Sequence, residues 1–149
     1  MKKGVQFNSL SVVELKSHHY FYPAEANFPV IDSFVFISEG SGAKVALLCF
    51  QMTVAKSHET KNSKLMELIG RFEKQFRYKN EPLEIVQHAG KWMVKHSTGP
   101  LELDVHLIYI VSNEWYEQFH KQDLQDTGNY DSLWNTVHQY KCRPPSKDT

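Results

Sequence analysis

The sequence has little of what marks the specialised classes of protein. Its 149 residues include only two cysteines, seven glycines and six prolines, and 17 basic residues are balanced by 17 acidic ones. The low glycine and proline content excludes a collagen-like chain, and the 41% hydrophobic content excludes a disordered one. A strong autonomous nucleic-acid binder usually carries a basic excess, which this neutral total lacks, although a local basic patch is compatible with it. The composition predicts an ordinary globular protein.

Long apolar runs and paired cysteines are also missing. No stretch approaches the ~20 apolar residues of a membrane span, so we expect no membrane partner. Residues 1–8 carry no apolar core of a signal peptide, although the chain can still be a piece of a longer protein. Cys49 lies in an apolar run, where a free thiol packs as a small hydrophobic side chain, and neither it nor Cys142 has metal-ligand spacing. A reducing compartment fits this usage.

We expect a single domain over residues 1–149, because this length suffices for one hydrophobic core and is short for two. Residues 1–19 are expected to be peripheral or frayed. Residues 144–149 are expected to be peripheral or frayed, since Pro144 and Pro145 end regular structure.

Two neighbouring strands are predicted at residues 30–37 and 43–54, joined by a Gly/Ser-rich turn. The second is apolar on both faces until Gln51, which is typical of a central strand. Because strand side chains alternate between faces, Gln51 and Thr53 point the same way, and Asp32 shares a face with Phe34 in the first strand. If the two strands pair, these three polar groups can converge.

An amphipathic helix is predicted from Asn62 or Ser63 to about Tyr78, because apolar residues recur there at helical spacing. Within residues 81–98, Leu83 to Val86 and Trp92 to Lys95 can form short strands, or a strand and a turn about Ala89-Gly90. The other predicted elements are a buried strand over 104–111, a short helix over 113–122 and a C-terminal helix within 130–140.

The order of a strand with Asp32, a strand with Gln51-x-Thr53, a helix, a buried strand and a helix resembles the core of the PD-(D/E)xK restriction-endonuclease-like superfamily. The resemblance implies an α/β fold, a mixed central sheet flanked by helices. It also implies that an Asp and an acidic residue or Gln bind Mg²⁺, while a Lys two residues further on steers the attacking water. Such side chains share a face, so they reach one phosphate together. Asp32 and Gln51 match the metal ligands, whereas Thr53 stands at the lysine position.

Three segments carry a closer resemblance: Tyr22 to Asp32, Phe50 to His58, and Ile108 to Val111 followed by Trp115, Phe119 and Gln122. Together they resemble the C-terminal domains of Crinkler-type effectors and retrotransposon-hot-spot-like proteins. The resemblance implies a nuclease-derived domain acting on DNA. It also implies a virulence role, as part of a larger secreted effector that works inside host cells, often in the nucleus, or beside an NTPase domain.

Thr53 is the serious departure from this pattern, because a neutral hydroxyl cannot stabilise a phosphorane as an ammonium does. Lys56 is a candidate replacement, although alternation places it on the face opposite Gln51, and His58 is a candidate proton carrier or phosphate contact. Glu14 or Glu25 can supply a further carboxylate.

Three functions therefore stay open: a metal-dependent nuclease, a catalytically inactive module that binds host protein or DNA, and a domain dependent on an NTPase partner. Under the second, Asp32 is bonded to nearby backbone and Gln51 is a satisfied core amide. The candidate nucleic-acid surface is Lys61, Lys64, Arg71 and Lys74, unless these residues are simply the solvated face of the helix.

Overall fold

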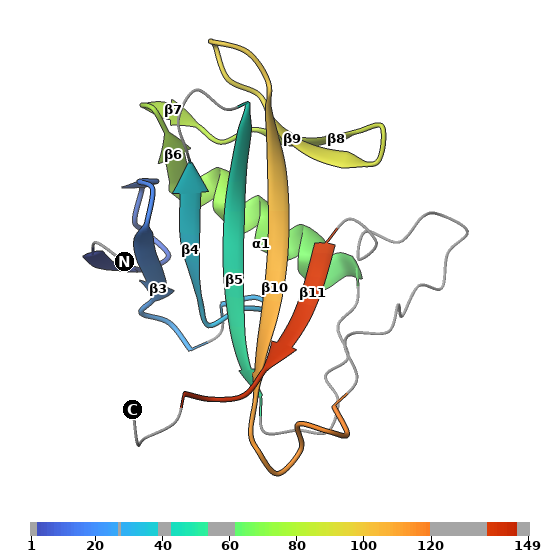
Figure 1. The fold of residues 1–149 in the computed structure, drawn as a ribbon. Coiled ribbons are helices and arrows are strands. Elements are labelled where there is room, and N and C mark those ends of the chain that lie inside the picture. Colours follow the sequence, from blue (N-terminus) through green and yellow to red (C-terminus); the bar gives the residue numbers. More distant parts are fainter. Residues whose placement is uncertain (1–2, 27, 39–42, 54–61, 120–136, 146–149) are drawn as a thin grey trace.

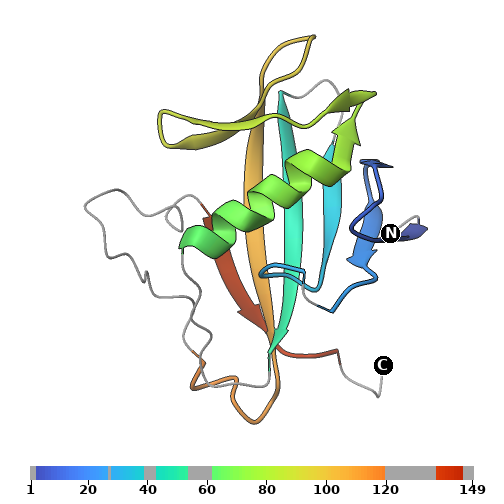
Figure 2. The same ribbon diagram turned by 180° about the vertical axis from the view of Figure 1, so that it is seen from behind.

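The computed structural model describes residues 3–26, 28–38, 43–53, 62–119 and 137–145. Helix α1 (Asn62–Gln75) lies diagonally across one face of a twisted mixed sheet, as the two opposite views show (Figures 1 and 2). The strands of this sheet are β1 (Lys3–Phe7), β3 (His19–Pro23), β4 (Ser33–Ser38), β5 (Lys44–Thr53), β8 (Ile85–His88), β9 (Lys91–Val94), β10 (Leu101–Val111) and β11 (Val137–Cys142). A small second sheet joins β2 (Val13–Glu14), β6 (Phe76–Tyr78) and β7 (Glu81–Pro82).

The strand order is β1-β3-β4-β5-β10-β9-β8, with β11 also paired to β10. Strand β4 runs antiparallel to β3 and β5, whereas β10 is parallel to both β5 and β11. Strand β10 has two partners on one edge, because Leu101–Leu103 pair with β9 and Val105–Ile110 pair with β11. The antiparallel pairing of the two strands predicted around Asp32 and Gln51 is confirmed.

Alternation along β5 and the helical period of α1 build the core between sheet and helix. Val45, Leu47 and Cys49 are buried in the same cluster as Leu65 and Leu68 of the helix. Burying one such side chain stabilises the fold by roughly 1.5–3 kcal/mol.

Aromatic rings close the same core at the β1–β3 side. The Phe34 ring of β4 lies 5.1 Å from Phe72 of α1 and 5.0 Å from Phe21 of β3, measured between centroids. Phe7 of β1 lies 5.0 Å from Phe76. Strand β1 is therefore anchored by a ring that is 1% exposed.

The predicted helix ends earlier than expected. It stops at Gln75, and Phe76–Tyr78 form strand β6, with Phe76 paired to Val13 of β2. The prediction of a helix to Tyr78 is wrong. Phe76 continues the helical spacing of apolar residues, which favours a longer helix, but its backbone pairs instead with Val13 of β2. Periodicity within the helix carries no information on that partner.

Two predicted helices are also wrong where the structure describes them. Residues 113–118 form successive turns, with Trp115 N–H donating to Ser112 O (3.0 Å) and Gln118 N–H to Trp115 O (3.1 Å). Lys141 from β11 holds these turns, donating to Tyr116 O at 2.8 Å. Residues 137–140 belong to strand β11 rather than to a C-terminal helix, because they pair in parallel with β10. Residues 120–122 and 130–136 of these two predicted helices lie outside the described residues.

Of the two arrangements left open about Ala89-Gly90, the structure has the pair of short strands, β8 and β9. Both turn residues have positive φ, 52° at Ala89 and 77° at Gly90, as a tight hairpin requires. At the coarse level the fold is the expected α/β arrangement with a mixed sheet, although it is mostly sheet. Within the described ranges α1 covers one face, and helices on both sides are not seen there.

Candidate functional site

Asp32 lies immediately before β4, at the end of the sheet where β5 finishes (bottom of Figure 1). Its N–H donates to Phe50 O at 2.8 Å, and its Oδ2 accepts the N–H of Met52 at 2.7 Å. Val30, two residues earlier, has a φ of 66°, so the chain turns away before it can extend the ladder. The Asp32 carboxylate thus accepts a β5 backbone N–H, the role that a backbone carbonyl of a neighbouring strand normally fills. This is the backbone-bonded role anticipated as the alternative to metal binding.

Gln51 and Thr53 do point the same way, as alternation predicts. They are 8% and 9% exposed, whereas Met52 between them is 68% exposed. Both turn toward the helix side of the sheet, since the buried residues of β5 share that face with α1. Asp32 is exposed, unlike Phe34, whose face it was expected to share. The strand begins one residue after Asp32, so alternation does not fix its direction.

The strand register adds two polar neighbours to this end of the sheet. Tyr109 of β10 is the register partner of Gln51, and its hydroxyl donates to Gln139 of β11 at 3.1 Å. Tyr109 is fully buried and Gln139 half-buried. Neither residue is a site candidate by sequence, because Tyr109 fits the pattern of an apolar strand and Gln139 lies in a predicted helix.

The described donors fit Mg²⁺ poorly. Mg²⁺ prefers six oxygen ligands, carboxylates among them, whereas here one exposed carboxylate already accepts a peptide N–H and the other candidate is a buried neutral amide. In the described ranges no group of three or more His, Cys, Asp or Glu side chains is placed to hold a metal ion. Glu25 is instead paired with Arg71, and Glu14 accepts the N–H of Asn80 at 2.9 Å. A metal at Asp32 and Gln51 stays a prediction.

Lys56, His58 and Lys61 lie outside the described residues, so their predicted roles are not located. Arg71 serves the fold: its guanidinium is 2.5 Å from Glu25, lies 4.7 Å over the Phe28 ring and donates to Gln75 Oε1 at 2.8 Å. Lys64 is exposed and lies 3.3 Å from Glu67, and Lys74 is exposed. Of the four residues predicted to meet nucleic acid, Lys64 and Lys74 are the ones that the structure shows open to solvent.

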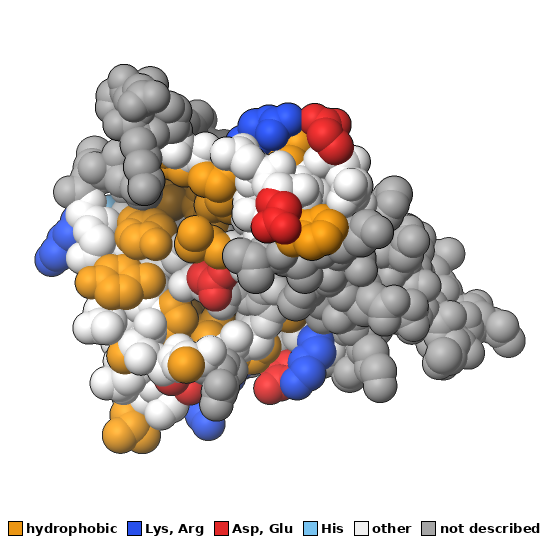
Figure 3. All heavy atoms as spheres, turned by 90° about the horizontal axis from the view of Figure 1, so that it is seen from below, with side chains coloured by type: hydrophobic (Ala, Val, Ile, Leu, Met, Phe, Trp, Pro, Cys, Tyr) orange, Lys and Arg blue, Asp and Glu red, His pale blue; other side chains and the backbone are white. Residues whose placement is uncertain are grey.

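The surface at this end of the sheet is not basic over the described residues. Figure 3 shows it from below, with hydrophobic side chains over much of the described area and Lys and Arg side chains standing apart around the margin. Phosphate binding depends on clustered positive charge. The view offers little support for a DNA-binding surface here.

The sheet surface opposite α1, called here the uncovered face, carries apolar and aromatic side chains. No described element packs over it (Figure 1). Register and alternation place these residues on it: Tyr20, Tyr22, Val35, Leu48, Phe50, Met52, His106, Ile108, Ile110, His138 and Tyr140. Most of them are half-buried by their neighbours, while Met52 and Tyr140 are 68% and 46% exposed.

Two histidines stack on this face as register partners. The rings of His106 and His138 are 4.8 Å apart, and His106 Nδ1 is 3.2 Å from the Tyr140 hydroxyl. Partial burial, followed by the nearby His138, lowers the pKa of His106, and Asp104 opposes this. The face therefore favours a neutral imidazole at His106.

The charged residues of the uncovered face gather at its upper end and compensate one another. Lys44 Nζ lies 3.8 Å from Asp104 and 3.9 Å from Glu102, and Lys91 Nζ lies 3.5 Å from Glu102. From Leu48 downward the half-buried and exposed residues named above are apolar or aromatic, while Ser33, the register partner of Phe50, is buried. The face as a whole is close to electroneutral.

A second polar cluster connects β7 to the turn after β9. Glu81 Oε2 accepts from Ser97 Oγ at 2.5 Å and lies 2.9 Å from His96 Nε2, while Thr98 Oγ1 is 2.8 Å from His96 Nδ1. The Ser97 hydrogen bond is the main cause that lowers the pKa of Glu81. The contacts of Glu81 with His96 and Ser97 join β7 to this turn, so we regard the cluster as structural.

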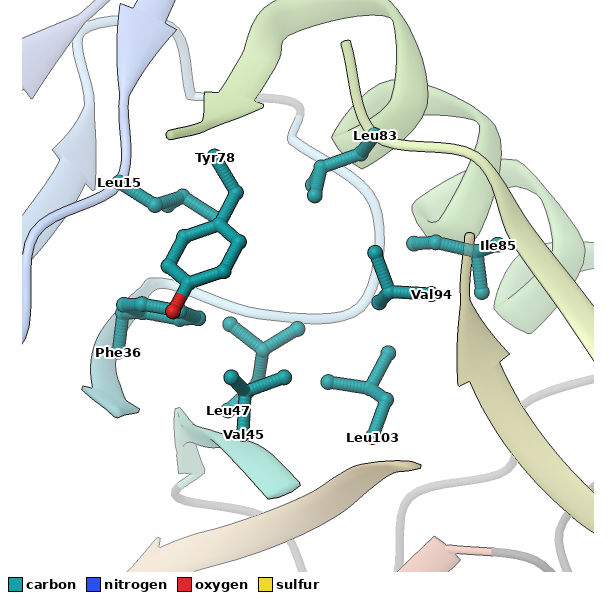
Figure 4. A pocket seen from close by; sticks show the side chains of 9 residues that line it. All are labelled: Leu15, Phe36, Val45, Leu47, Tyr78, Leu83, Ile85, Val94 and Leu103. Atoms are coloured by element: carbon teal, nitrogen blue, oxygen red, sulfur yellow. The ribbon is translucent and has the colours of Figure 1, made fainter. Parts of the chain in front are cut away.

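A small gap remains inside the core between the sheet, β6 and the β8–β9 hairpin. Figure 4 shows the side chains that line it, which are hydrocarbon apart from the hydroxyl of Tyr78. That hydroxyl already bonds Ser38 Oγ at 2.8 Å. The volume is about 10 Å³, close to the minimum for one water, which would also need several polar partners. This gap is a packing defect and not a ligand site.

No protein-family model, curated protein or solved structure matches this chain. Among the described residues, the one long helix is too short and too polar to span a membrane.

Proposed function

We propose that this chain is a non-catalytic binding module that docks another protein surface on the uncovered face. The observation that carries the proposal is the apolar surface of β5 and β10 on the side away from α1, formed by Leu48, Phe50, Ile108 and Ile110. Parallel strands are generally covered on both faces, and a contiguous apolar patch on a protein surface marks an interaction site.

A protein partner fits this face better than nucleic acid does. The lysines on it, Lys44 and Lys91, are engaged with Glu102 and Asp104, which leaves no excess positive charge among its described residues to meet phosphates. Its exposed groups are thioether, aromatic and aliphatic, the types enriched in protein interfaces. In the effector setting implied by the resemblance, the partner would be a host protein.

The Asp32 arrangement supports the non-catalytic part of the proposal. Its carboxylate holds β4 to the Met52 N–H, and Gln51 and Thr53 are less than a tenth exposed. A phosphodiester cannot approach Gln51 and Thr53 without rearrangement of the core. In this proposal Asp32, Gln51 and Thr53 stabilise the fold and perform no catalysis.

A second candidate function is the effector-type, Mg²⁺-dependent nuclease acting on DNA. One observation favours it: continuing the β4–β5 register by one residue sets Asp32 opposite Gln51, the pair that the nuclease pattern requires. Lys56 or His58 would then complete the site, and a neighbouring NTPase domain would be a partner for the whole protein.

Plasmid cleavage separates the two functions. We expect no Mg²⁺- or Mn²⁺-dependent nicking by the purified chain, and no rise in its melting temperature with either ion. Asp32→Asn keeps an oxygen for the Met52 N–H but loses the charge that a metal needs. Nicking by the wild type that disappears in Asp32→Asn, with its folding intact, would replace the binding module by the nuclease.

Dye binding tests the docking face directly. We expect the protein to enhance the fluorescence of anilinonaphthalene sulfonate, and Met52→Glu to reduce this enhancement. Met66→Glu is the matched control, because Met66 is 49% exposed on the helix side of the molecule. No enhancement by the wild type, or equal losses in both variants, would count against the uncovered face as a docking surface.

A further inference from the structure

We propose that the occupant of the uncovered face is a second copy of this chain, so that two molecules pack sheet against sheet. This inference rests on the proposed docking function and names its partner. Face-to-face packing of sheets, about 10 Å apart, is a common way to bury the second face of a sheet. A twofold pair is also the commonest closed assembly of identical chains.

The size of the face fits a weak but specific pair. The five strands β3, β4, β5, β10 and β11 lie side by side in this order. At about 4.8 Å between strands and about 3.3 Å per residue, they present a flat area on the order of 500 Å². Because side chains project from the sheet, the accessible area of the face is larger than this flat area. It approaches the roughly 600–800 Å² per partner of small to standard interfaces. We expect a dissociation constant in the micromolar range.

The charge pattern of the face permits self-pairing. Two copies of a face with excess charge would repel, whereas here Lys44 and Lys91 compensate Glu102 and Asp104 within one molecule. These groups are confined to the upper end, and the centre, around Leu48 and Ile108, is uncharged. The apolar centre of one copy can therefore meet that of the other without a buried unpaired charge.

The exposed side chains are placed to contribute to such a contact. Met52 stands 68% exposed at the lower end of β5, and Tyr140 stands 46% exposed on β11. Met adapts to irregular surfaces, and Tyr brings a large rigid ring to an interface. The stacked rings of His106 and His138 extend the aromatic margin beside Tyr140.

Light scattering on a sizing column, over loading concentrations from about 5 µM to about 500 µM, tests the inference. We expect the mass to rise from 17.4 kDa toward twice that value. Met52→Glu should weaken association at least ten-fold, because it places a charge in the contact. Met66→Glu should leave it unchanged within two-fold. Circular dichroism melts report whether each variant folds, and Tyr140→Ser provides a second, uncharged change on the face.

The possible outcomes distinguish a failure of self-pairing from a failure of the proposed docking function. A wild type that stays at 17.4 kDa throughout overturns self-pairing, as does a Met66→Glu that weakens association as much as Met52→Glu. If that monomer still enhances dye fluorescence in a Met52-dependent way, the docking face stands and its occupant is a different protein. A monomer without dye enhancement overturns both.

Discussion

The carboxylate of Asp32 accepts the backbone N–H of Met52 at 2.7 Å, while the side chains of Gln51 and Thr53 on either side of Met52 turn into the core. One residue of a nuclease-like pattern is thus used to hold two strands together. The same strand end sends the Met52 side chain to the opposite, uncovered face.

Asp32→Ala should lower the free energy of unfolding by about 1–2 kcal/mol, because the Met52 N–H loses its acceptor. Asp32→Asn should change it much less, since the amide oxygen can still accept. Urea unfolding of the three proteins measures the difference. Equal stability of Asp32→Ala and the wild type would show that the hydrogen bond contributes nothing.

Phe34→Ala should lower the free energy of unfolding by about 3–5 kcal/mol. The Phe34 ring is fully buried and contacts the rings of Phe7, Phe21, Phe72 and Phe76, so its removal leaves a cavity where β1, β3 and α1 meet. Chemical denaturation checks this. Met66→Ala, at an exposed helix position, is the control and should cost less than about 0.5 kcal/mol.

Acidification should release the Glu81 cluster. The folded-state pKa of Glu81 lies below its ordinary value of 4.5, chiefly because Ser97 donates to the carboxylate. Its contribution is therefore present above pH 4.5 and is lost as the pH falls through the lowered value. Between neutral pH and pH 3 the melting temperature of the wild type should fall more than that of Glu81→Gln. Parallel profiles would show that the contact does not matter.

His106 should titrate below the ordinary value of 6.5. Partial burial and His138 disfavour its protonation, Asp104 favours it, and the groups that face it are Asp104, itself paired with Lys44, His138 and Tyr140. Because the folded state binds this proton less tightly than the unfolded chain, stability should decline as the pH falls below 6.5. NMR titration of the imidazole measures the midpoint, which should rise in His138→Gln. A midpoint above 6.5 would contradict the shift.

The two thiols should differ in reactivity. Burial raises the pKa of Cys49 to about 12, so its thiolate is scarce and shielded, whereas Cys142 is half-buried at the end of β11. At pH 8 a disulfide reagent should modify one thiol per native chain and both in denaturant. Cys142→Ser should leave the native protein unreactive. Rapid modification of that variant would show that the strand opens readily.

Much of the sheet was predictable because its signal is local. The apolar runs of β5 and β10 and the helical spacing from Leu65 to Phe72 follow from burial within each element. Strand β11 was predicted as a helix because Leu133, Trp134 and Val137 repeat at helical spacing. Its residues 137–142 became a strand through hydrogen bonds to β10, which lies far away in sequence. The spacing of apolar residues within a segment does not predict such a partner.

For the candidate site, the sequence by itself determined that Gln51 and Thr53 share a face, because adjacent side chains in a strand alternate. It placed Asp32 within the first strand, on the face of Phe34, whereas the strand begins one residue after Asp32. Only the tertiary structure decided which face is covered by α1, and hence that Gln51 and Thr53 are buried while Met52 is exposed. Only the tertiary structure set the Met52 N–H beside the Asp32 carboxylate, because that contact depends on the register of two strands and on the turn at Val30.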